Sequence, residues 1–312
     1  MSINQTASAR DVQHGLLLMT LAMLILLGID ATTKFLLDWI SSGQIAWSRF
    51  FFQILFLLPF VLRHGSLRVG RRLWVHAARG ILIAVGTLMF FTSLANLPLA
   101  DAISIFFVGP FILTFLSAVF LGESVGWRRI FAVAVGFCGA LIVIRPSLEM
   151  FGLVSLLPAG AAFAYACYMA LTRWLTKGDG VAVMQFYSGV FGGLTMSLAL
   201  WLGGEADVAI LTSVWPTMSQ WLWLTVLGVI ATLGHWMIVL AVRRVGAGMV
   251  APLQYLEIVG ATILGLVFFG DFSDPTTWLG VTIIVGSGLY VFYRERKLSP
   301  AADARAEGVA NP

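Results

Sequence analysis

The chain is a succession of long apolar runs, separated by short segments that are rich in charged residues, glycine or proline. A helix that crosses a hydrocarbon core of roughly 30 Å needs about 20 mostly apolar residues, and the runs have about this length. Strands of a membrane barrel would alternate apolar and polar residues, and these runs do not alternate. The pattern therefore predicts transmembrane helices. The ten expected spans are 15–37, 44–62, 73–95, 98–121, 128–144, 152–172, 182–202, 219–242, 246–269 and 276–293.

Positive charge alternates between the two sides of these spans. Of the 19 Lys and Arg residues, 15 lie in the two tails or in connections that an even number of spans puts on the same side as the tails. Connections on the other side carry Glu205, Asp207, Asp271 and Asp274. Because positively charged loops are poorly translocated, Lys and Arg gather in the cytoplasm. We therefore expect both termini to be cytoplasmic.

Composition also indicates a membrane protein, with 59% hydrophobic residues, 11% charged residues and a mean hydropathy of +0.93. The net charge of +4 does not indicate a nucleic-acid partner, because such a partner requires a basic stripe on a folded surface. Cys138 and Cys167 lie inside apolar runs, so no disulfide framework is expected. The first run is too long for a signal peptide and carries Asp30 and Lys34, so we expect it to remain as a span.

The two halves of the chain resemble each other. Pro110 to Glu123, followed by a span with Gly139, aligns with Ile258 to Asp271, followed by a span with Gly288. Because each half has five predicted spans, an odd number, the second half enters the membrane in the opposite sense. The predicted fold class is an all-α membrane protein of ten transmembrane helices, in two five-helix inverted-topology repeats around a central cavity. Its expected parts are a cytoplasmic N-terminal tail (1–14), two repeats (15–145 and 152–293) and a cytoplasmic C-terminal tail (294–312).

These features resemble the drug/metabolite transporter (DMT) superfamily, and specifically its EamA-type members, over about residues 15 to 293. The resemblance rests on Leu121-Gly122-Glu123 at the end of the Pro110 helix, on Tyr255-Leu256-Glu257 in a helix that ends at Gly270-Asp271, on Arg49, and on Gly139 and Gly288. The second copy has Ile258 where a proline is common and Asp271 where glutamate is common. These two departures leave the fold expectation intact and remove support for a proline hinge in the second copy.

Within the superfamily, Asp30 to Lys34 and Gln44 to Arg49 are similar to a bacterial subgroup that includes carriers of riboflavin and of S-adenosylmethionine. The resemblance implies a secondary transporter in the bacterial inner (cytoplasmic) membrane, working by alternating access. It implies a small organic metabolite as substrate, with riboflavin and S-adenosylmethionine as the leading candidates. Aromatic residues with few charges in the expected cavity indicate a planar or amphipathic compound, such as these two or another aromatic compound. The lipid bilayer is then the second expected partner.

Ionisable side chains inside spans are costly and therefore mark candidate functional residues. Glu257 lies near the middle of the span 246–269, too deep for a short side chain to reach the headgroups. It can bind a cationic substrate group or take up a proton, or it can be a structural hydrogen-bond partner between helices. Gln254, three residues earlier, shares its helix face. We assign both residues to the expected substrate site.

Four residues are candidates for gating or coupling. Asp30 and Lys34, spaced i and i+4, are expected to pair near the outer end of the first span, as an interfacial ion pair or as a gate. Arg49 lies near the outer mouth and can attract an anionic group, whereas Arg79, near the inner mouth, is expected to extend to the headgroups. Pro110 is a candidate site for a bend.

Aromatic and polar residues complete the expected substrate site. Tyr165 and Tyr168 lie beside small residues inside the sixth span, where they can stack on a planar substrate or pack in the core. His235 can relay protons or hydrogen-bond between helices. The other candidates are Phe91, Asn96, Phe106 and Trp236.

Other function classes lack their motifs. An intramembrane enzyme would need a nucleophile motif or metal ligands, and the sequence has no HExxH or GxSxG. An ATP-driven pump would need a phosphate-binding loop of the GxxxxGK[ST] kind, which is also absent. We therefore expect no enzyme activity, no cofactor and no metal site. A lipid flippase and a channel-like pore stay compatible with the sequence, and a homodimer is left open.

Overall fold

The computed structural model describes residues 9–64, 72–120, 127–175, 180–245, 253, 256–271, 274–290 and 293, and these residues are almost entirely helical. The longer helices are α1 (Ala9–Leu36), α2 (Ser42–His64), α3 (Leu73–Leu94), α4 (Leu99–Phe106), α5 (Gly109–Phe120), α6 (Trp127–Phe151), α7 (Leu157–Leu175), α8 (Val181–Glu205), α9 (Met218–Val245), α11 (Leu256–Leu264) and a helix at 275–290. Shorter elements are the 3₁₀ helices η2 (Gly152–Leu156) and η3 (Ala209–Leu211) and the π-helix η5 (Gly265–Phe269).

Six helical stretches in the described part of the chain are long and apolar enough to cross a membrane. They are Gln13–Leu36, Ser42–Arg63, Leu73–Leu94, Ala134–Thr172, Val181–Glu205 and Met218–Ile238. The fourth stretch comprises most of α6 and α7, which η2 joins. Leu99–Leu113 and Leu256–Phe269 are shorter apolar helices. The prediction of an all-helical, multi-pass membrane protein is therefore confirmed.

The side-chain distribution explains why such a bundle is stable in lipid. Many large apolar side chains lie on the outside, for example Phe163 (54% exposed) and Leu222 (64% exposed). Monomeric soluble proteins rarely expose so much contiguous apolar surface. Polar and charged side chains such as Gln53 and Arg79 are buried instead. In a bilayer this arrangement puts apolar groups against lipid tails and polar groups against each other.

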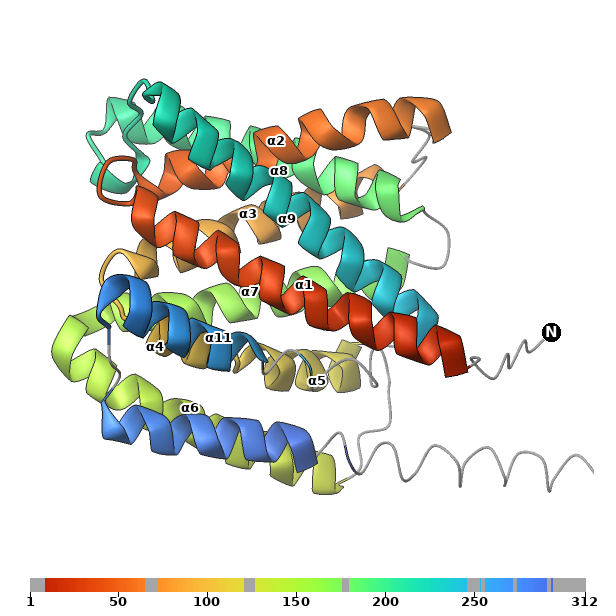
Figure 1. Ribbon diagram of the computed structural model, residues 1–312, viewed down its shortest axis with the longest axis vertical. Helices are drawn as coiled ribbons and strands as arrows, with labels where there is room; N and C mark the ends of the chain where they lie inside the picture. The colour runs from red at the N-terminus through yellow and green to blue at the C-terminus, as the bar shows by residue number, and fades with distance from the viewer. Residues whose placement is uncertain are drawn as a thin grey trace, which may run out of the picture.

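Figure 1 shows the helices running back and forth between the two ends of the bundle. Hydrogen bonds join several connections at one end, which we call the α1–α2 end. Ser41 Oγ donates to the Thr212 carbonyl at 2.6 Å, and the Gln44 side chain bonds both backbone groups of Val214, at 2.7 and 2.9 Å. The connections 37–41 and 206–217 are therefore held together there.

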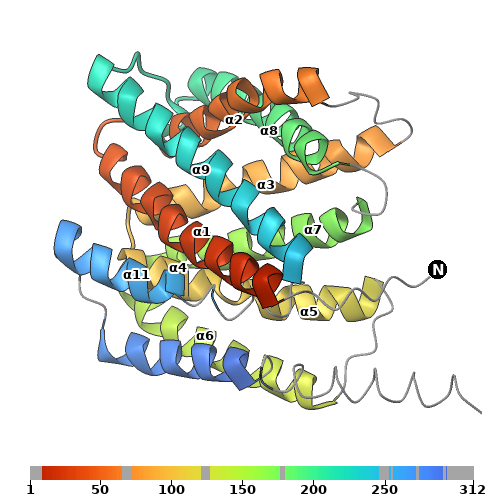
Figure 2. The same ribbon diagram turned by 45° about the vertical axis from the view of Figure 1, so that its right-hand side comes forward.

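The helices form layers that are visible in both ribbon views (Figures 1 and 2). The α2 and α8 helices pack on each other at one side of the molecule. Next to them, α9 packs on α1 and α7 packs on α3. The α4 and α11 helices also lie side by side, and α6 lies with the helix at 275–290 at the opposite side. Most elements that carry the candidate site residues thus lie between two outer helix pairs, and α2, which carries Arg49, belongs to one of these pairs.

The predicted fourth span is interrupted. The α4 helix ends at Phe106 and α5 begins at Gly109, so Phe107 and Val108 interrupt the regular helix. Pro110 is the second residue of α5, a position where the missing N–H of proline costs little, since the first turn has no intrahelical acceptor for it. The break therefore coincides with the candidate bend at Pro110.

Glycine and alanine let several helices approach closely. A Cβ atom on Gly86 of α3 or Gly109 of α5 would lie about 3.4 to 3.6 Å from atoms of Ala161, Ala162 or Ala164 on α7. The small residues of the sixth span therefore serve close helix packing. The α6 helix meets the helix at 275–290 at Gly139 and Gly280, where a Cβ on Gly280 would lie 2.7 Å from the Gly139 carbonyl oxygen.

We predict that Gly280→Ala destabilises the protein. The added methyl group would lie 2.5 Å from Val143 Cγ2 as well as 2.7 Å from the Gly139 carbonyl, and overpacking of this kind typically costs about 1–3 kcal/mol. The melting temperature of the detergent-purified variant should fall below that of the wild type. Gly286→Ala on the same helix is the matched control, because its methyl group would meet no atom within 4 Å. Equal melting temperatures for the two variants would contradict this packing.

Candidate functional site

Polar side chains from five helices gather in the interior of the bundle. We call Asp30 (α1), Arg49 (α2), Thr87 (α3), His235 (α9) and Glu257 (α11) the central cluster. Asp30 and Arg49 are only 7% and 8% exposed. Asp30 interacts electrostatically with both Arg49 and Glu257. The structure thus brings together four ionisable residues that the sequence had singled out separately, from helices far apart along the chain.

Hydrogen bonds hold the Arg49 guanidinium in place. Its Nη1 donates to the Thr87 hydroxyl, and its Nη2 lies 3.4 Å from His235 Nε2. His235 Nδ1 lies 2.9 Å from the Ala231 carbonyl oxygen. A carbonyl can only accept and a guanidinium can only donate, so the neutral imidazole with its proton on Nδ1 satisfies both contacts. Arg49 is therefore the only cation of the central cluster.

A row of aromatic rings lies beside the central cluster. The ring of Phe90 on α3 contacts that of Phe106 on α4 at 5.2 Å between centroids, and Phe106 contacts Tyr165 at 5.7 Å. Tyr165 stacks on Tyr168 at 5.8 Å. We call these four residues the aromatic row. Tyr165 also interacts electrostatically with Glu257 and Arg49, which connects the row to the central cluster.

Arg79 lies inside the protein, so the prediction that it extends to the headgroups is wrong. It is 1% exposed. Its Nε donates to Thr172 Oγ1 at 2.9 Å, its Nη1 to the Met184 carbonyl at 3.2 Å and its Nη2 to the Tyr168 hydroxyl at 3.2 Å. Its Cζ also lies 4.8 Å from the centroid of the Tyr168 ring. These partners on α7 and α8 compensate the loss of water, so the side chain need not reach the membrane surface.

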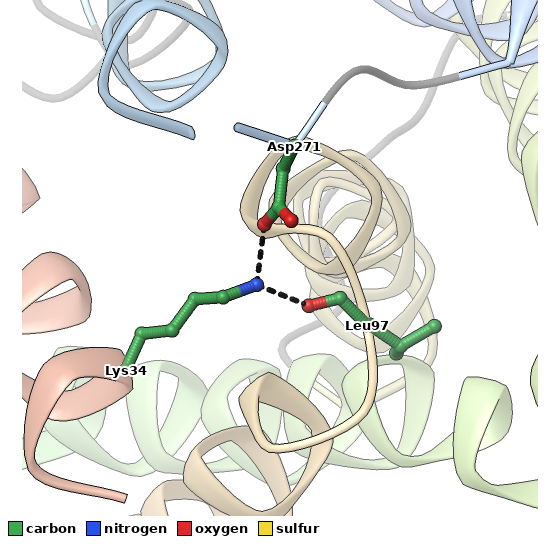
Figure 3. Close-up of polar contacts among 3 residues, drawn as sticks. All are labelled: Lys34, Leu97 and Asp271. Carbon is green, nitrogen blue, oxygen red and sulfur yellow. Dashed lines mark hydrogen bonds and ion pairs between the residues drawn. The ribbon is translucent and has the colours of Figure 1, made fainter. Parts of the chain in front are cut away.

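Lys34 does not pair with Asp30, so that predicted pair is also wrong. Figure 3 shows Lys34 between two partners from distant segments. Its Nζ lies 2.5 Å from Asp271 Oδ2 and 2.9 Å from the Leu97 carbonyl oxygen. Asp30 instead faces Arg49 and Glu257 in the interior, while the long Lys34 stem reaches the end of η5. One cation thereby joins α1, the α3–α4 connection and the segment after η5.

An open pocket of about 310 Å³ lies beside this ion pair, at the α1–α2 end. Its wall combines charged and apolar side chains. The lining residues are Lys34, Phe35, Leu37, Asp38, Leu94, Ala95, Phe268 and Phe269. The Lys34 ammonium also lies 5.4 Å from the centroid of the Phe269 ring. Lys34, one member of the ion pair, therefore lines a pocket that opens at this end of the bundle.

The remaining predicted residues lie in different surroundings. Phe91 is 2% exposed and belongs to the hydrophobic core, so its neighbour Phe90 is the residue that joins the aromatic row. Asn96 is exposed in the connection between α3 and α4. Trp236 packs against Phe60 at 5.1 Å and lines a small pocket with His235 and Gln53. Gln254 lies outside the described residues.

Sequence reasoning missed the uncharged partners of the arginines. Thr87 and Thr172 hold Arg49 and Arg79, but a threonine in an apolar run gives no signal of its own, because many such residues bond their own helix backbone. Asp271 was noted as a loop charge and as the end of the second repeated segment, but not as a partner of Lys34. Its position at the end of a span opposite Lys34 could have indicated the pair only with knowledge of the helix arrangement.

We predict that Arg79→Lys destabilises the protein, since the three acceptors are bonded by three different nitrogens of a planar guanidinium, and the single nitrogen of lysine cannot reach all three positions. Each buried acceptor left without a donor costs about 1–3 kcal/mol. The melting temperature in detergent should fall clearly below that of Arg145→Lys, a control in which the side chain is 84% exposed and pairs only with Glu149 of its own helix. A melting temperature equal to that of the control would refute the buried network.

Comparisons with known proteins agree with the fold. A solved crystal structure shares the fold, with a TM-score of 0.63 and 18% sequence identity over 92% of this chain and 99% of that chain. The S-adenosylmethionine uptake transporter of Rickettsia bellii is 29% identical over 272 residues, which is 86% of this chain and 89% of that protein. The riboflavin transporter of Brucella anthropi is 28% identical over 266 residues, 84% of this chain and 92% of that protein.

One family accounts for nearly the whole chain. The EamA-like transporter family matches residues 13–145 and, a second time, residues 152–293. The relatives are bacterial and the described helices are long enough to span a membrane repeatedly, so the protein is a multi-pass bacterial membrane protein and not an enzyme. The chain belongs to the EamA-like transporter family.

Proposed function

We propose that this protein is a secondary transporter that carries a small organic metabolite across the bacterial inner membrane by alternating access. The observation that carries the proposal is the central cluster. Its residues come from α1, α2 and α3 in the first half of the chain and from α9 and α11 in the second half. A site with ligands from both halves changes its access when the halves rock against each other, as in other transporters built from repeats.

In this proposal the fold has ten transmembrane helices in two inverted five-helix repeats, at 15–145 and 152–293. Two features support the repeats. The family matches the chain twice, with nearly these limits. The helix contacts also repeat, because α1 packs on α9 as its counterpart α7 packs on α3, and α1 packs on α11 as α7 packs on α4. In this arrangement both tails are cytoplasmic, and the α1–α2 end faces outward.

We assign the substrate to the part of the bundle interior where the central cluster meets the aromatic row. Glu257 and Gln254 would bind its polar part, with His235 and Trp236 nearby. Tyr165, Tyr168 and Phe106 would stack on its ring. Phe90 takes the place that Phe91 had in the sequence-based site, because Phe91 lies in the core. The relatives named for S-adenosylmethionine and for riboflavin both handle planar ring compounds, which a row of stacked aromatic side chains suits.

Glu257→Gln should weaken substrate binding at least tenfold, since the variant keeps the shape of the side chain and loses its charge. The measurement is thermal stabilisation of the purified full chain by S-adenosylmethionine, riboflavin, aromatic amino acids and nucleosides, followed by uptake of the stabilising compound into proteoliposomes. Glu149→Gln is the matched control, because Glu149 is 70% exposed on α6.

Two results would contradict the proposal in different ways. Stabilisation by lipids and by none of the soluble compounds would favour a flippase. Equal ligand stabilisation of the wild type and Glu257→Gln would keep the transporter and remove Glu257 from the site.

We further propose that Lys34 and Asp271 form an outer latch between the halves. The pair joins α1 of the first repeat to the end of η5 in the second, and it has to break if the α1–α2 end opens. Asp30 lies deeper on α1, the helix that also carries Lys34, and it faces Arg49. In this proposal, the interaction of Asp30 with Arg49 connects the latch to the bound substrate. Pro110 and the interruption before it would let α4 bend during the same motion.

Asp271→Asn should increase the fraction of molecules in which the outer end is open, because the variant loses the ion pair with Lys34. A cysteine introduced as Phe90→Cys, in a background without Cys138 and Cys167, should react several-fold faster with a membrane-impermeant maleimide added to intact cells. The charge-swapped double variant Lys34→Asp with Asp271→Lys should return the labelling rate toward that of the parent. Unchanged labelling in Asp271→Asn, or no recovery in the swap, would show that the pair is not a latch.

A further inference from the structure

The pocket at the α1–α2 end lies where three apolar helical stretches stop. The stretches of α1, of α3 and of α11 with η5 end at Leu36, Leu94 and Phe269. Leu94 and Phe269 line the pocket, as do Phe35 and Leu37 on either side of Leu36. A membrane-crossing helix becomes polar where the hydrocarbon ends, so this pocket lies at the depth of the lipid headgroups. It is separate from the central cluster, none of whose residues lines it.

Part of the pocket wall is made of apolar side chains on the outside of the bundle. Phe35 on α1 is 41% exposed and Phe268 on η5 is 71% exposed, and both line the pocket. The two rings come from neighbouring elements, because α1 packs on α11 and η5 continues α11 (Figure 1). At this depth such rings are stable against acyl chains and costly against water. A bound molecule can therefore extend an apolar part along them into the hydrocarbon.

Two charged groups of opposite sign line the same pocket. Lys34 and Asp38 lie four residues apart, on the last turn of α1 and in the connection that follows it. An ammonium has three N–H donors, and Lys34 uses one on Asp271 and one on the Leu97 carbonyl oxygen. One donor is left for an anionic oxygen. In the part of the chain that the structure describes, no residue pairs with the Asp38 carboxylate.

These features select one class of ligand. An anionic oxygen for Lys34, an N–H cation for Asp38 and an apolar body are combined in a phospholipid with a primary amine in its headgroup. A further negative charge is unfavourable, because Asp38 and Asp271 already face a single Lys34. A primary amine is favoured over a quaternary ammonium, since only the primary amine donates charge-assisted hydrogen bonds to a carboxylate.

We propose that this pocket is a binding site for a phospholipid of the phosphatidylethanolamine type. The phosphate binds Lys34, the amine binds Asp38, and the acyl chains lie along Phe35 and Phe268. The contact between Lys34 and Asp271 stays in place, because the phosphate uses the remaining N–H. The lipid is a resident ligand and not the transported compound. The site requires only that the protein lies in a bilayer, so it goes beyond the proposed transport function and does not rest on it.

The test uses probes that each lack one feature of the proposed ligand. Short-chain phosphatidylcholine has no N–H on its cation, and short-chain phosphatidylglycerol has no cation. Glycerophosphoethanolamine keeps the headgroup and has no acyl chains. Binding to the full chain in detergent is measured by thermal shift at increasing concentrations of each compound. We expect short-chain phosphatidylethanolamine to bind about fivefold more tightly than each of the three, or better.

Two variants assign the headgroup to its partners. Asp38→Asn should reduce the preference for phosphatidylethanolamine over phosphatidylcholine to about twofold or less, because the amine loses its carboxylate. In Lys34→Gln the preference for phosphatidylethanolamine over a short-chain diacylglycerol should shrink, because the phosphate loses its cation. Glu205→Gln is the matched control, an exposed acid at the last residue of α8, and should leave both preferences unchanged. Each preference compares two ligands on one protein, so a general loss of stability does not produce it.

Four results would overturn this site. Equal binding of phosphatidylethanolamine and phosphatidylcholine by the wild type is the first, and an unchanged preference in Asp38→Asn is the second. Glycerophosphoethanolamine that binds as tightly as the lipid would make the ligand a soluble zwitterion. Loss of the preference in Glu257→Gln would move the lipid to the central cluster and make it the transported compound. Uptake of soluble metabolites tests the transport function separately, and its failure would leave the lipid site standing.

Discussion

The bilayer offers no water to ionisable side chains, and this constraint decides where the polar residues of the chain lie. Each buried charge must find its partners inside the bundle or stay costly. Arg79 meets the constraint fully, with three hydrogen bonds and the face of Tyr168. Arg49 meets it only in part, since Thr87 and His235 leave its Nε without an acceptor. The difference separates a structural arginine from one that can serve a ligand.

Close packing through glycine also joins two helices that carry no residue of the central cluster. The crossing of α6 with the helix at 275–290 depends on Gly139 and Gly280, where backbones nearly touch, and no residue of the central cluster lies on these two helices. The cluster lies instead on α1, α2, α3, α9 and α11, whose contacts with each other are made partly by polar groups.

The sequence predicted the elements well, since an apolar run between charged segments has few alternatives in a membrane. The described helices follow the predicted spans closely. One exception is α6, which continues to Phe151, beyond the predicted end at 144, with Pro146 inside the helix. Partners were harder to predict. Lys34 has an acid four residues earlier on its own helix, yet its flexible stem reaches Asp271, 237 residues away. A one-dimensional pattern contains spacing along a helix but no information about which helices are neighbours.

The interruption between α4 and α5 has a consequence for how this protein can be studied. Pro110 has no N–H, so the Phe106 carbonyl oxygen, four residues earlier, lacks the donor that a continuous helix would provide. This oxygen belongs to the main chain of Phe106, whose ring is part of the aromatic row. Alanine scanning removes side chains and leaves such an atom in place. Alanine scanning of this site will therefore not detect a contribution of this backbone oxygen.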